Sequence, residues 1–186
     1  PRELPFIVGT ELCGTVAAAG DDVAAISVGD RVVTANAVGA YAEYCCAPAD
    51  FVAYVPESVP SDAIASALLK GMTAHYLIKS VYEVQPGDWL LVHAGAGGVG
   101  LILTQWATSI GARVITTAST PEKAELSRRA GAVEVLDYPE DPAQFAALVR
   151  DLSDGHGAAA VYDGVGKSTF DASLASLAVR GTLALF

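Results

Sequence analysis

The feature that most constrains this chain is a glycine-rich stretch at residues 92–100, with the sequence VHAGAGGVG. Gly95, Gly97 and Gly100 have the spacing G-x-G-x-x-G directly after an apolar run. In such a turn the first glycine allows a tight bend, the second removes a Cβ where a pyrophosphate approaches, and the third lets helix and strand pack closely. N–H groups at the N-terminus of the following helix favour negative charge. The spacing therefore predicts a dinucleotide site.

A glycine pattern alone is weak evidence for a dinucleotide site. Residues on both sides of the glycines support the prediction. Residues 89–92 form a short apolar run, WLLV, typical of a buried parallel strand. Downstream, apolar side chains recur at helical spacing until Gly111, where a glycine would end the helix; they are Val99, Ile102, Leu103, Trp106 and Ile110. The alternative is a glycine turn in another kind of α/β domain.

The rest of the chain repeats the alternation of strand and helix. Further strands are predicted at residues 113–117, 133–137, 158–163 and 182–186. Helices are predicted at residues 123–130, after Thr120-Pro121 as N-cap and first position, from Asp141-Pro142 onward, and around Phe170, Leu174 and Leu177. This alternation predicts a doubly wound parallel α/β sheet of the Rossmann kind, with five strands visible. Because such a sheet normally has a sixth strand, we expect the chain to be an internal piece of a longer protein.

The composition narrows the class of protein. A formal net charge of -10 and a pI near 4.5 argue against nucleic-acid binding, which needs a basic face. Glycine, proline or a charged residue interrupts every apolar run, so no membrane segment is expected. The three cysteines, two of them adjacent, do not suit a disulfide framework. A reducing, cytoplasmic setting fits these cysteines better.

The first part of the chain has a different pattern. Short β-rich runs at residues 12–18, 31–34, 42–46 and 51–55 are typical of a β-barrel. Residues 56–60 suit a hinge, and helices are predicted at residues 61–69 and 73–81. We therefore expect part of a β-barrel domain and the hinge at residues 1–70, and a dinucleotide-binding domain at residues 71–186.

Several short motifs carry a resemblance to a known family. They are GTE at residues 9–11, GTV at 14–16, VGDRV at 28–32, GAYAEY at 39–44, KGMTA at 70–74 and VYDGVG at 161–166. Together with the glycine-rich stretch they resemble the medium-chain dehydrogenase/reductase superfamily, and within it the zeta-crystallin-like quinone oxidoreductases. The resemblance implies a GroES-like catalytic domain, a Rossmann domain and NADPH-dependent reduction of a small-molecule quinone. For the full-length protein we expect a homodimer.

Zinc is the first question that this resemblance raises. The zinc-containing alcohol dehydrogenases of the superfamily carry a histidine ligand at the position of Thr10. Cys13, Cys45 and Cys46 lack the spacing of a tetrahedral site, and the three histidines are expected to be packed or solvated. The sequence therefore predicts a metal-free reductase. A quinone suits such chemistry, because its conjugated ring already accepts hydride.

The coenzyme can be predicted from charge. NAD sites place an acidic residue about twenty residues beyond the glycines, where it would repel a 2′-phosphate. This chain instead has TTAST at residues 116–120, with Lys123 four positions after Ser119. A hydroxyl, a helix N-terminus and an ammonium group favour NADPH. The resemblance also implies that Lys123 meets the 2′-phosphate and that Tyr138 lies near the adenosine. The alternatives are a solvated lysine and an aromatic residue that covers the core.

The predicted cofactor contacts are Ala96, Gly97, Gly98, Val99 and Gly100 in the turn, with Ser119, Lys123, Tyr138, Thr73, Val165 and Phe186. Thr73 matches a family position near the nicotinamide, although a helix N-cap explains it almost as well. Val165 and Phe186 lie at the ends of strands that face the expected crevice, and Phe186 could instead belong to the core. Glu11 and Tyr41 could line the substrate side or serve as buried structural partners.

We expect direct hydride transfer from nicotinamide C4 to the quinone, with positioning as the main contribution of the protein. No catalytic residue is assigned, because the family's substrate-side asparagine and tyrosine precede residue 1. The isolated piece is therefore expected to be inactive. Two alternatives are open: an enoyl-thioester reductase of the same superfamily, and an NADPH-binding structural or sensor protein without turnover.

Overall fold

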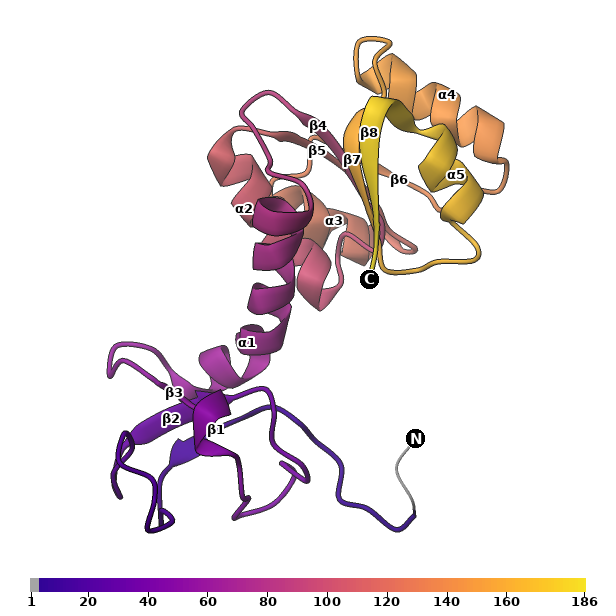
Figure 1. The fold of residues 1–186 in the computed structure, drawn as a ribbon. Coiled ribbons are helices and arrows are strands. Elements are labelled where there is room, and N and C mark those ends of the chain that lie inside the picture. The colour runs from indigo at the N-terminus through magenta and orange to yellow at the C-terminus, as the bar shows by residue number, and fades with distance from the viewer. Residues whose placement is uncertain (1–3) are drawn as a thin grey trace. The chain divides into compact units, whose positions relative to one another are not determined.

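The computed structural model describes residues 4–186 of the chain. These residues divide into two compact units, one ending at Lys70 and the other covering Gly71–Phe186. Within residues 4–186, no helix is both long and apolar enough to cross a membrane. Figure 1 shows the helices and strands of both units.

The first unit contains a small antiparallel sheet. Its strands are β1 (Leu12–Thr15), β2 (Arg31–Thr34) and β3 (Ala53–Tyr54), in the order β1-β2-β3. Val33 on the central strand lies opposite Cys13 on one side and Ala53 on the other. The side chains of Val32 and Val33 are buried, so β2 provides the core of this sheet.

Three strands predicted for the first unit differ from those in the structure. Residues 42–46 form no strand, and Tyr44 within them and Tyr41 before them are exposed. The strand expected at residues 51–55 is reduced to β3, which follows a short 3-10 helix at Ala49–Phe51. The strand expected at 12–18 ends at Thr15. The β-branched and aromatic content of such runs favours a strand only where a neighbouring strand pairs with it.

Helix α1 (Ser61–Tyr76) replaces the two helices expected at residues 61–69 and 73–81, and a π-helix at Leu77–Val81 follows it directly. Gly71 lies inside α1, where a glycine costs about 1 kcal/mol relative to alanine but does not end the helix. Thr73 is consequently in the helix interior. The interpretation of Thr73 as an N-cap is wrong.

The second unit is built on a five-stranded parallel sheet with the strand order β6-β5-β4-β7-β8 (Figure 1). The strands are β4 (Trp89–Val92), β5 (Arg113–Thr117), β6 (Glu134–Leu136), β7 (Ala158–Asp163) and β8 (Leu177–Leu185). Numbered within this unit, the order is 3-2-1-4-5, which is that of a doubly wound dinucleotide-binding fold. The predicted fold class is confirmed, and the strand order reverses between β4 and β7.

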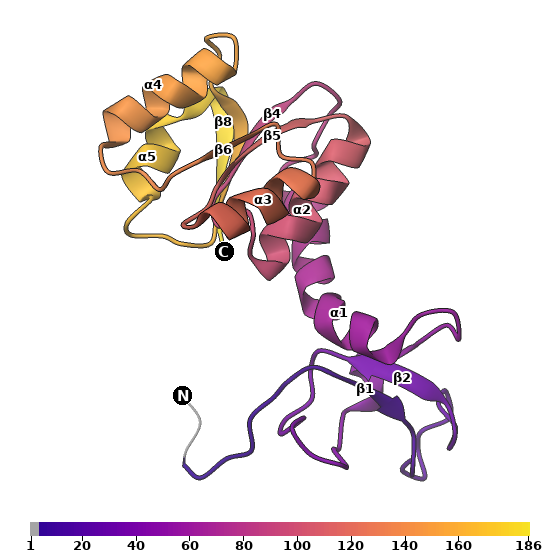
Figure 2. The same ribbon diagram turned by 180° about the vertical axis from the view of Figure 1, so that it is seen from behind.

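Helices cover both faces of this sheet. Helices α2 (Gly98–Ile110) and α3 (Pro121–Arg129) lie on one face, and α4 (Pro142–Leu152) and α5 (Phe170–Ala175) lie on the other (Figures 1 and 2). Strand β4 alternates between the two cores, because Leu90 and Val92 pack with α2 while Leu91 packs with Phe145 of α4. This double burial explains the continuous apolar run WLLV.

Local chemistry sets the helix ends. The Thr120 hydroxyl accepts the N–H of Lys123 at the start of α3, and the Asp141 carboxylate accepts the N–H groups of Ala143 and Gln144 at the start of α4. Gly111, with φ 101°, ends α2 in the left-handed conformation. These ends agree with the sequence.

The C-terminal part differs from the prediction. Strand β8 begins at Leu177, which was expected to be in a helix, and α5 ends at Ala175. Leu177 pairs with Ala158 of β7, and a register shift precedes the next pair, Ala160 with Thr182. Pairing with β7 therefore outweighs the helical spacing of Leu177.

Candidate functional site

The glycine turn joins β4 to α2, and its glycines have different roles. A Cβ on Gly95 would lie 2.4 Å from Thr116 Cβ and 2.7 Å from Ser127 Oγ, so this glycine lets the turn contact β5 and α3. A Cβ on Gly100 would lie 2.4 Å from the Ala94 carbonyl oxygen. Gly97 and Gly98 are exposed instead. Two glycines are therefore required for packing, while Gly97 and Gly98 leave the surface of the turn open.

The open surface lies at the N-terminus of α2. Gly97 is the N-cap residue, and no side chain caps the helix. The N–H groups of the first helical residues, Gly98, Val99 and Gly100, have no acceptor within the helix because of their position. The first turn also carries no acidic residue. Together these features make an anion site suited to a pyrophosphate.

Ser119 and Lys123 lie together at the end of β5. The Lys123 ammonium donates a hydrogen bond to Ser119 Oγ at 3.2 Å, and both side chains are exposed. The Lys123 ammonium lies in the first turn of α3, where the helix dipole disfavours a cation. A bound anion would offset that repulsion.

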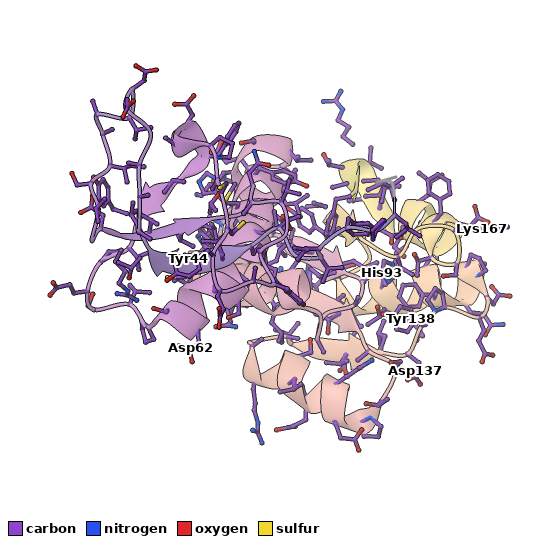
Figure 3. All side chains as sticks on the ribbon, turned by 90° about the horizontal axis from the view of Figure 1, so that it is seen from below. Tyr44, Asp62, His93, Asp137, Tyr138 and Lys167 are labelled. Atoms are coloured by element: carbon purple, nitrogen blue, oxygen red, sulfur yellow. The ribbon has the colours of Figure 1, made fainter. Side chains whose placement is uncertain are left out.

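Tyr138 follows β6 and is half-buried. Its ring stacks with that of His93, with 6.4 Å between the centroids and an interplanar angle of 20° (Figure 3). The ring of Phe145 also stacks with that of His93, with 5.8 Å between the centroids. Tyr138 is thus anchored to the core, and its contact with an adenosine stays a prediction.

The loop after β7 is held by a buried carboxylate. Asp163 is 1% exposed and accepts hydrogen bonds from the N–H groups of Val165 and Gly166, both at 2.9 Å. It also accepts from Thr169 Oγ1 at 2.8 Å and Ser173 Oγ at 2.7 Å. Burial raises the pKa of Asp163, but these hydrogen bonds outweigh burial and hold the pKa below its usual value. The carboxylate therefore stays ionised and fixes the loop.

Val165 and Phe186 belong to one cluster around this loop. A Cβ on Gly164 would lie 3.1 Å from the Phe186 ring, so the ring covers the backbone beside Val165. Both side chains are partly exposed. The loop follows β7, the neighbour of β4, and ligands bind at such a reversal of strand order. Thr73 lies half-buried in α1, and its contact with a cofactor stays a prediction.

His93 at the end of β4 is 2% exposed. Burial lowers its pKa from 6.5 to about 4, although the nearby charge of Asp163 opposes the shift. His93, Thr117 and Asp163 were not among the predicted site residues. Their position at the carboxyl ends of strands is the signal that could have found them.

We expect the buried imidazole to make stability depend on pH. The unfolded state takes up a proton near pH 6.5 and the folded state only near pH 4, so the free energy of unfolding falls as the pH is lowered between these values. The contribution of His93 is about 3 kcal/mol. Urea unfolding of the protein and of His93→Gln at several pH values would measure it. An equal loss in both proteins would contradict this expectation.

Within residues 4–186, no group of three histidine, cysteine or acidic side chains could hold a metal ion. Cys13, Cys45 and Cys46 are free thiols. The residues that the structure describes therefore do not fit the zinc of the metal-dependent alcohol dehydrogenases.

Comparison with known proteins agrees with this architecture. Residues 1–57 match the alcohol dehydrogenase GroES-like domain, and residues 98–186 match the zinc-binding dehydrogenase family. The quinone oxidoreductase of Pseudomonas aeruginosa is 41% identical over 184 residues, which are 98% of this chain and 56% of that protein.

Solved structures are similar over the same range. A mycobacterial protein in complex with NADPH is 70% identical with a TM-score of 0.96, covering 100% of this chain and 58% of its own. The Escherichia coli quinone oxidoreductase complexed with NADPH is 39% identical with a TM-score of 0.91, covering 98% of this chain and 56% of its own.

A Rossmann sheet preceded by a GroES-like segment defines a medium-chain dehydrogenase/reductase. Within this superfamily, the chain belongs to the quinone oxidoreductase family. It spans little more than half of its relatives, from 56% of the Pseudomonas protein to 58% of the mycobacterial one.

Proposed function

We propose that the protein containing this chain is an NADPH-dependent reductase that transfers hydride to a quinone or a similar activated carbonyl. The observation that carries this proposal is the pair of anion-binding features in the second unit. One is the open N-terminus of α2 at Gly97 and Gly98, and the other is Ser119 with Lys123 at the end of β5. Relatives solved with NADPH support the same cofactor.

The charge at the end of β5 supports NADPH over NADH. The residues from Thr116 to Thr120 include no acid that would bind a ribose 2′-hydroxyl and repel a 2′-phosphate. The Lys123 ammonium, held by Ser119 Oγ, offers a charge-assisted hydrogen bond to that phosphate. The phosphate would in turn relieve the repulsion between Lys123 and the dipole of α3.

When bound, NADPH supplies the hydride from its nicotinamide ring. The N–H groups at the start of α2 bind the pyrophosphate, and Ser119 and Lys123 bind the 2′-phosphate. The loop at Gly164–Gly166, fixed by Asp163, forms one wall beside the reversal of strand order. In this proposal the chain contributes binding and orientation, which are the main contributions of a protein to hydride transfer.

A conjugated alkene is the second candidate substrate. The 2-haloacrylate reductase of a Burkholderia species is 41% identical over 187 residues, 99% of this chain and 56% of that protein. Such an acceptor and an enoyl thioester both take hydride at an activated carbon. The homodimer and the cytoplasmic location stay predictions.

The proposal is tested on the full-length protein by following NADPH oxidation with a simple quinone, a 2-haloacrylate and an enoyl thioester. Turnover with the quinone would support the proposed function. Turnover with only the 2-haloacrylate or the enoyl thioester would show that the substrate is an activated alkene and not a quinone. Tight NADPH binding without any turnover would support a structural or sensor role instead.

Lys123→Ala should raise the KM for NADPH about 10- to 100-fold, because a hydrogen bond to a charged group is lost. The KM for NADH should stay within about twofold, since NADH has no 2′-phosphate. Arg128→Ala is the matched control: it removes the same charge from an exposed position near the other end of α3. Equal effects on both coenzymes, or equal effects of the two variants, would exclude Lys123 as the 2′-phosphate ligand.

A further inference from the structure

We propose that Thr117 and His93 are positioning residues that clamp Ala94 in a strained conformation and thereby shape the glycine turn for its cofactor. The inference rests on the proposed NADPH site, and it assigns a role to side chains behind the turn rather than on its surface. It starts from the backbone of Ala94.

Ala94 adopts a left-handed conformation, with φ 52°, that residues with a Cβ rarely take. Its carbonyl oxygen accepts the N–H of Gly97 at 2.8 Å. A Cβ on Gly100 would lie only 2.4 Å from the same oxygen. The orientation of the Ala94 peptide thus determines how the turn closes before α2, and the conformation must be held by neighbours.

Thr117 on β5 holds two successive amides of the turn. Its side-chain Oγ1 accepts the N–H of Ala94 at 3.2 Å, and its carbonyl oxygen accepts the N–H of Gly95 at 2.9 Å. The side chain is fully buried. Because the Gly95 bond uses only the backbone, the hydroxyl is the part of Thr117 that acts specifically on Ala94.

His93 orients this hydroxyl. Its Nδ1 lies 3.1 Å from Thr117 Oγ1. Since Oγ1 already accepts from Ala94, its proton is available to donate to Nδ1, which requires the neutral imidazole with its proton on Nε2. The lowered pKa of His93 agrees with a neutral ring. The ring of His93 packs against Tyr138 and Phe145, so its Nδ1 atom is held in a defined position.

Packing alone does not account for His93. Its Nε2 has no hydrogen-bond partner within the described residues, and an apolar ring would avoid the cost of burying that group. The hydrogen bond at Nδ1 is what a phenylalanine could not provide. His93 could therefore serve as a hydrogen-bond acceptor for Thr117 or only as a ring that fills the core. Variants of His93 can distinguish these two roles.

The test measures NADPH affinity of the full-length protein by fluorescence titration. Thr117→Val keeps the shape and removes the hydroxyl, and it should weaken binding about tenfold. In an Ala94→Gly background the same change should weaken binding less than about threefold, because glycine takes a positive φ without strain. Thr117→Ser should restore binding to within about twofold of the original protein. An equal loss in both backgrounds, or no rescue by serine, would overturn the clamp.

His93→Asn and His93→Phe form a second pair. Asparagine keeps an acceptor near the place of Nδ1 and phenylalanine keeps only the ring, so the clamp requires tighter NADPH binding by His93→Asn. Tighter binding by His93→Phe would indicate packing. Hydrogen exchange at the Ala94 amide gives a readout without cofactor, and Thr117→Val should accelerate it well beyond any change at Gly95. Failure of the original protein to bind NADPH would refute the proposed function alone, and the exchange would then decide the clamp.

Discussion

Replacing Asp163 by alanine is expected to lower the free energy of unfolding by about 3–5 kcal/mol and to raise the KM for NADPH. The carboxylate is buried, and it is the shared acceptor for two loop amides and the hydroxyls of Thr169 and Ser173. Without it, the buried Thr169 and Ser173 hydroxyls and the two partly buried loop amides would lose their shared acceptor. The loop at Gly164–Gly166 would then lose the contacts that fix it beside β4.

Asp163→Asn should show how much of this loss comes from the loop amides and how much from the hydroxyls. The Oδ1 atom accepts both loop amides, Ser173 Oγ donates to Oδ2, and Thr169 Oγ1 lies within 2.9 Å of both oxygens. Asparagine with its oxygen at the place of Oδ1 can therefore keep the amide bonds while the Ser173 hydroxyl reorients. The loss should therefore be smaller, about 1–3 kcal/mol. Urea unfolding and coenzyme kinetics of the full-length protein would measure both effects.

Asp171→Ala is the matched control for Asp163. Asp171 is an exposed acid in the first turn of α5, and its removal should cost less than about 1 kcal/mol. A comparable loss at the two positions would mean that the charge of this region matters, rather than the anchoring of the loop.

The sequence predicted the second unit well because its signals are local. Strands β4, β5 and β7 have the predicted bounds, and the N-caps Thr120 and Asp141 start their helices as expected. Each of these features depends on a few adjacent residues, such as a cap followed by proline. The pairing of Ser119 with Lys123 is equally local, since Ser119 precedes the N-cap of α3 and Lys123 lies in its first turn, only four residues further along the chain.

Predictions failed where distant residues decide the structure. Residues 42–46 have a strand-like composition, yet the pairing that would make them a strand depends on segments far along the chain. Leu177 fits a helical pattern, but its pairing with Ala158 on β7 places it in a strand. The two helices predicted at residues 61–69 and 73–81 are joined through Gly71 into one helix that continues to Tyr76.

The supporting residues of the site were missed for the same reason. The His93–Thr117 contact joins residues 24 positions apart and exists only because β4 and β5 are neighbours in the sheet. The role of Asp163 depends on how the following loop folds back over its carboxylate. Sequence patterns thus locate the surface of a nucleotide site better than the side chains that hold it.

Gly100→Ala should mainly destabilise the fold, whereas Gly97→Ala should mainly weaken NADPH binding. A Cβ on Gly100 would lie 2.4 Å from the Ala94 carbonyl oxygen and 2.9 Å from the Gly95 backbone, neither of which can move without opening the turn. Gly100→Ala should therefore cost about 3 kcal/mol or more in the free energy of unfolding.

A Cβ on Gly97 would lie 3.0 Å from the Ala94 carbonyl oxygen, with its next neighbour at 4.0 Å, and Gly97 is exposed. The fold should tolerate Gly97→Ala at a cost of less than about 1 kcal/mol. The added methyl group, however, stands where the pyrophosphate must approach the backbone, so the Kd for NADPH should rise about tenfold or more. Urea unfolding and fluorescence titration of the full-length protein would measure the two effects separately.

Gly14→Ala controls for the addition of a methyl group, because a Cβ there meets no atom within 4 Å. It should leave NADPH affinity unchanged. If Gly97→Ala also left the affinity unchanged while Gly100→Ala unfolded the protein, the glycines would serve only to pack α2 against the sheet. The turn would then be that of an α/β fold in general, and the dinucleotide site would have to lie elsewhere. A loss of affinity confined to Gly97→Ala among the stably folded variants would place the phosphates at the N-terminus of α2.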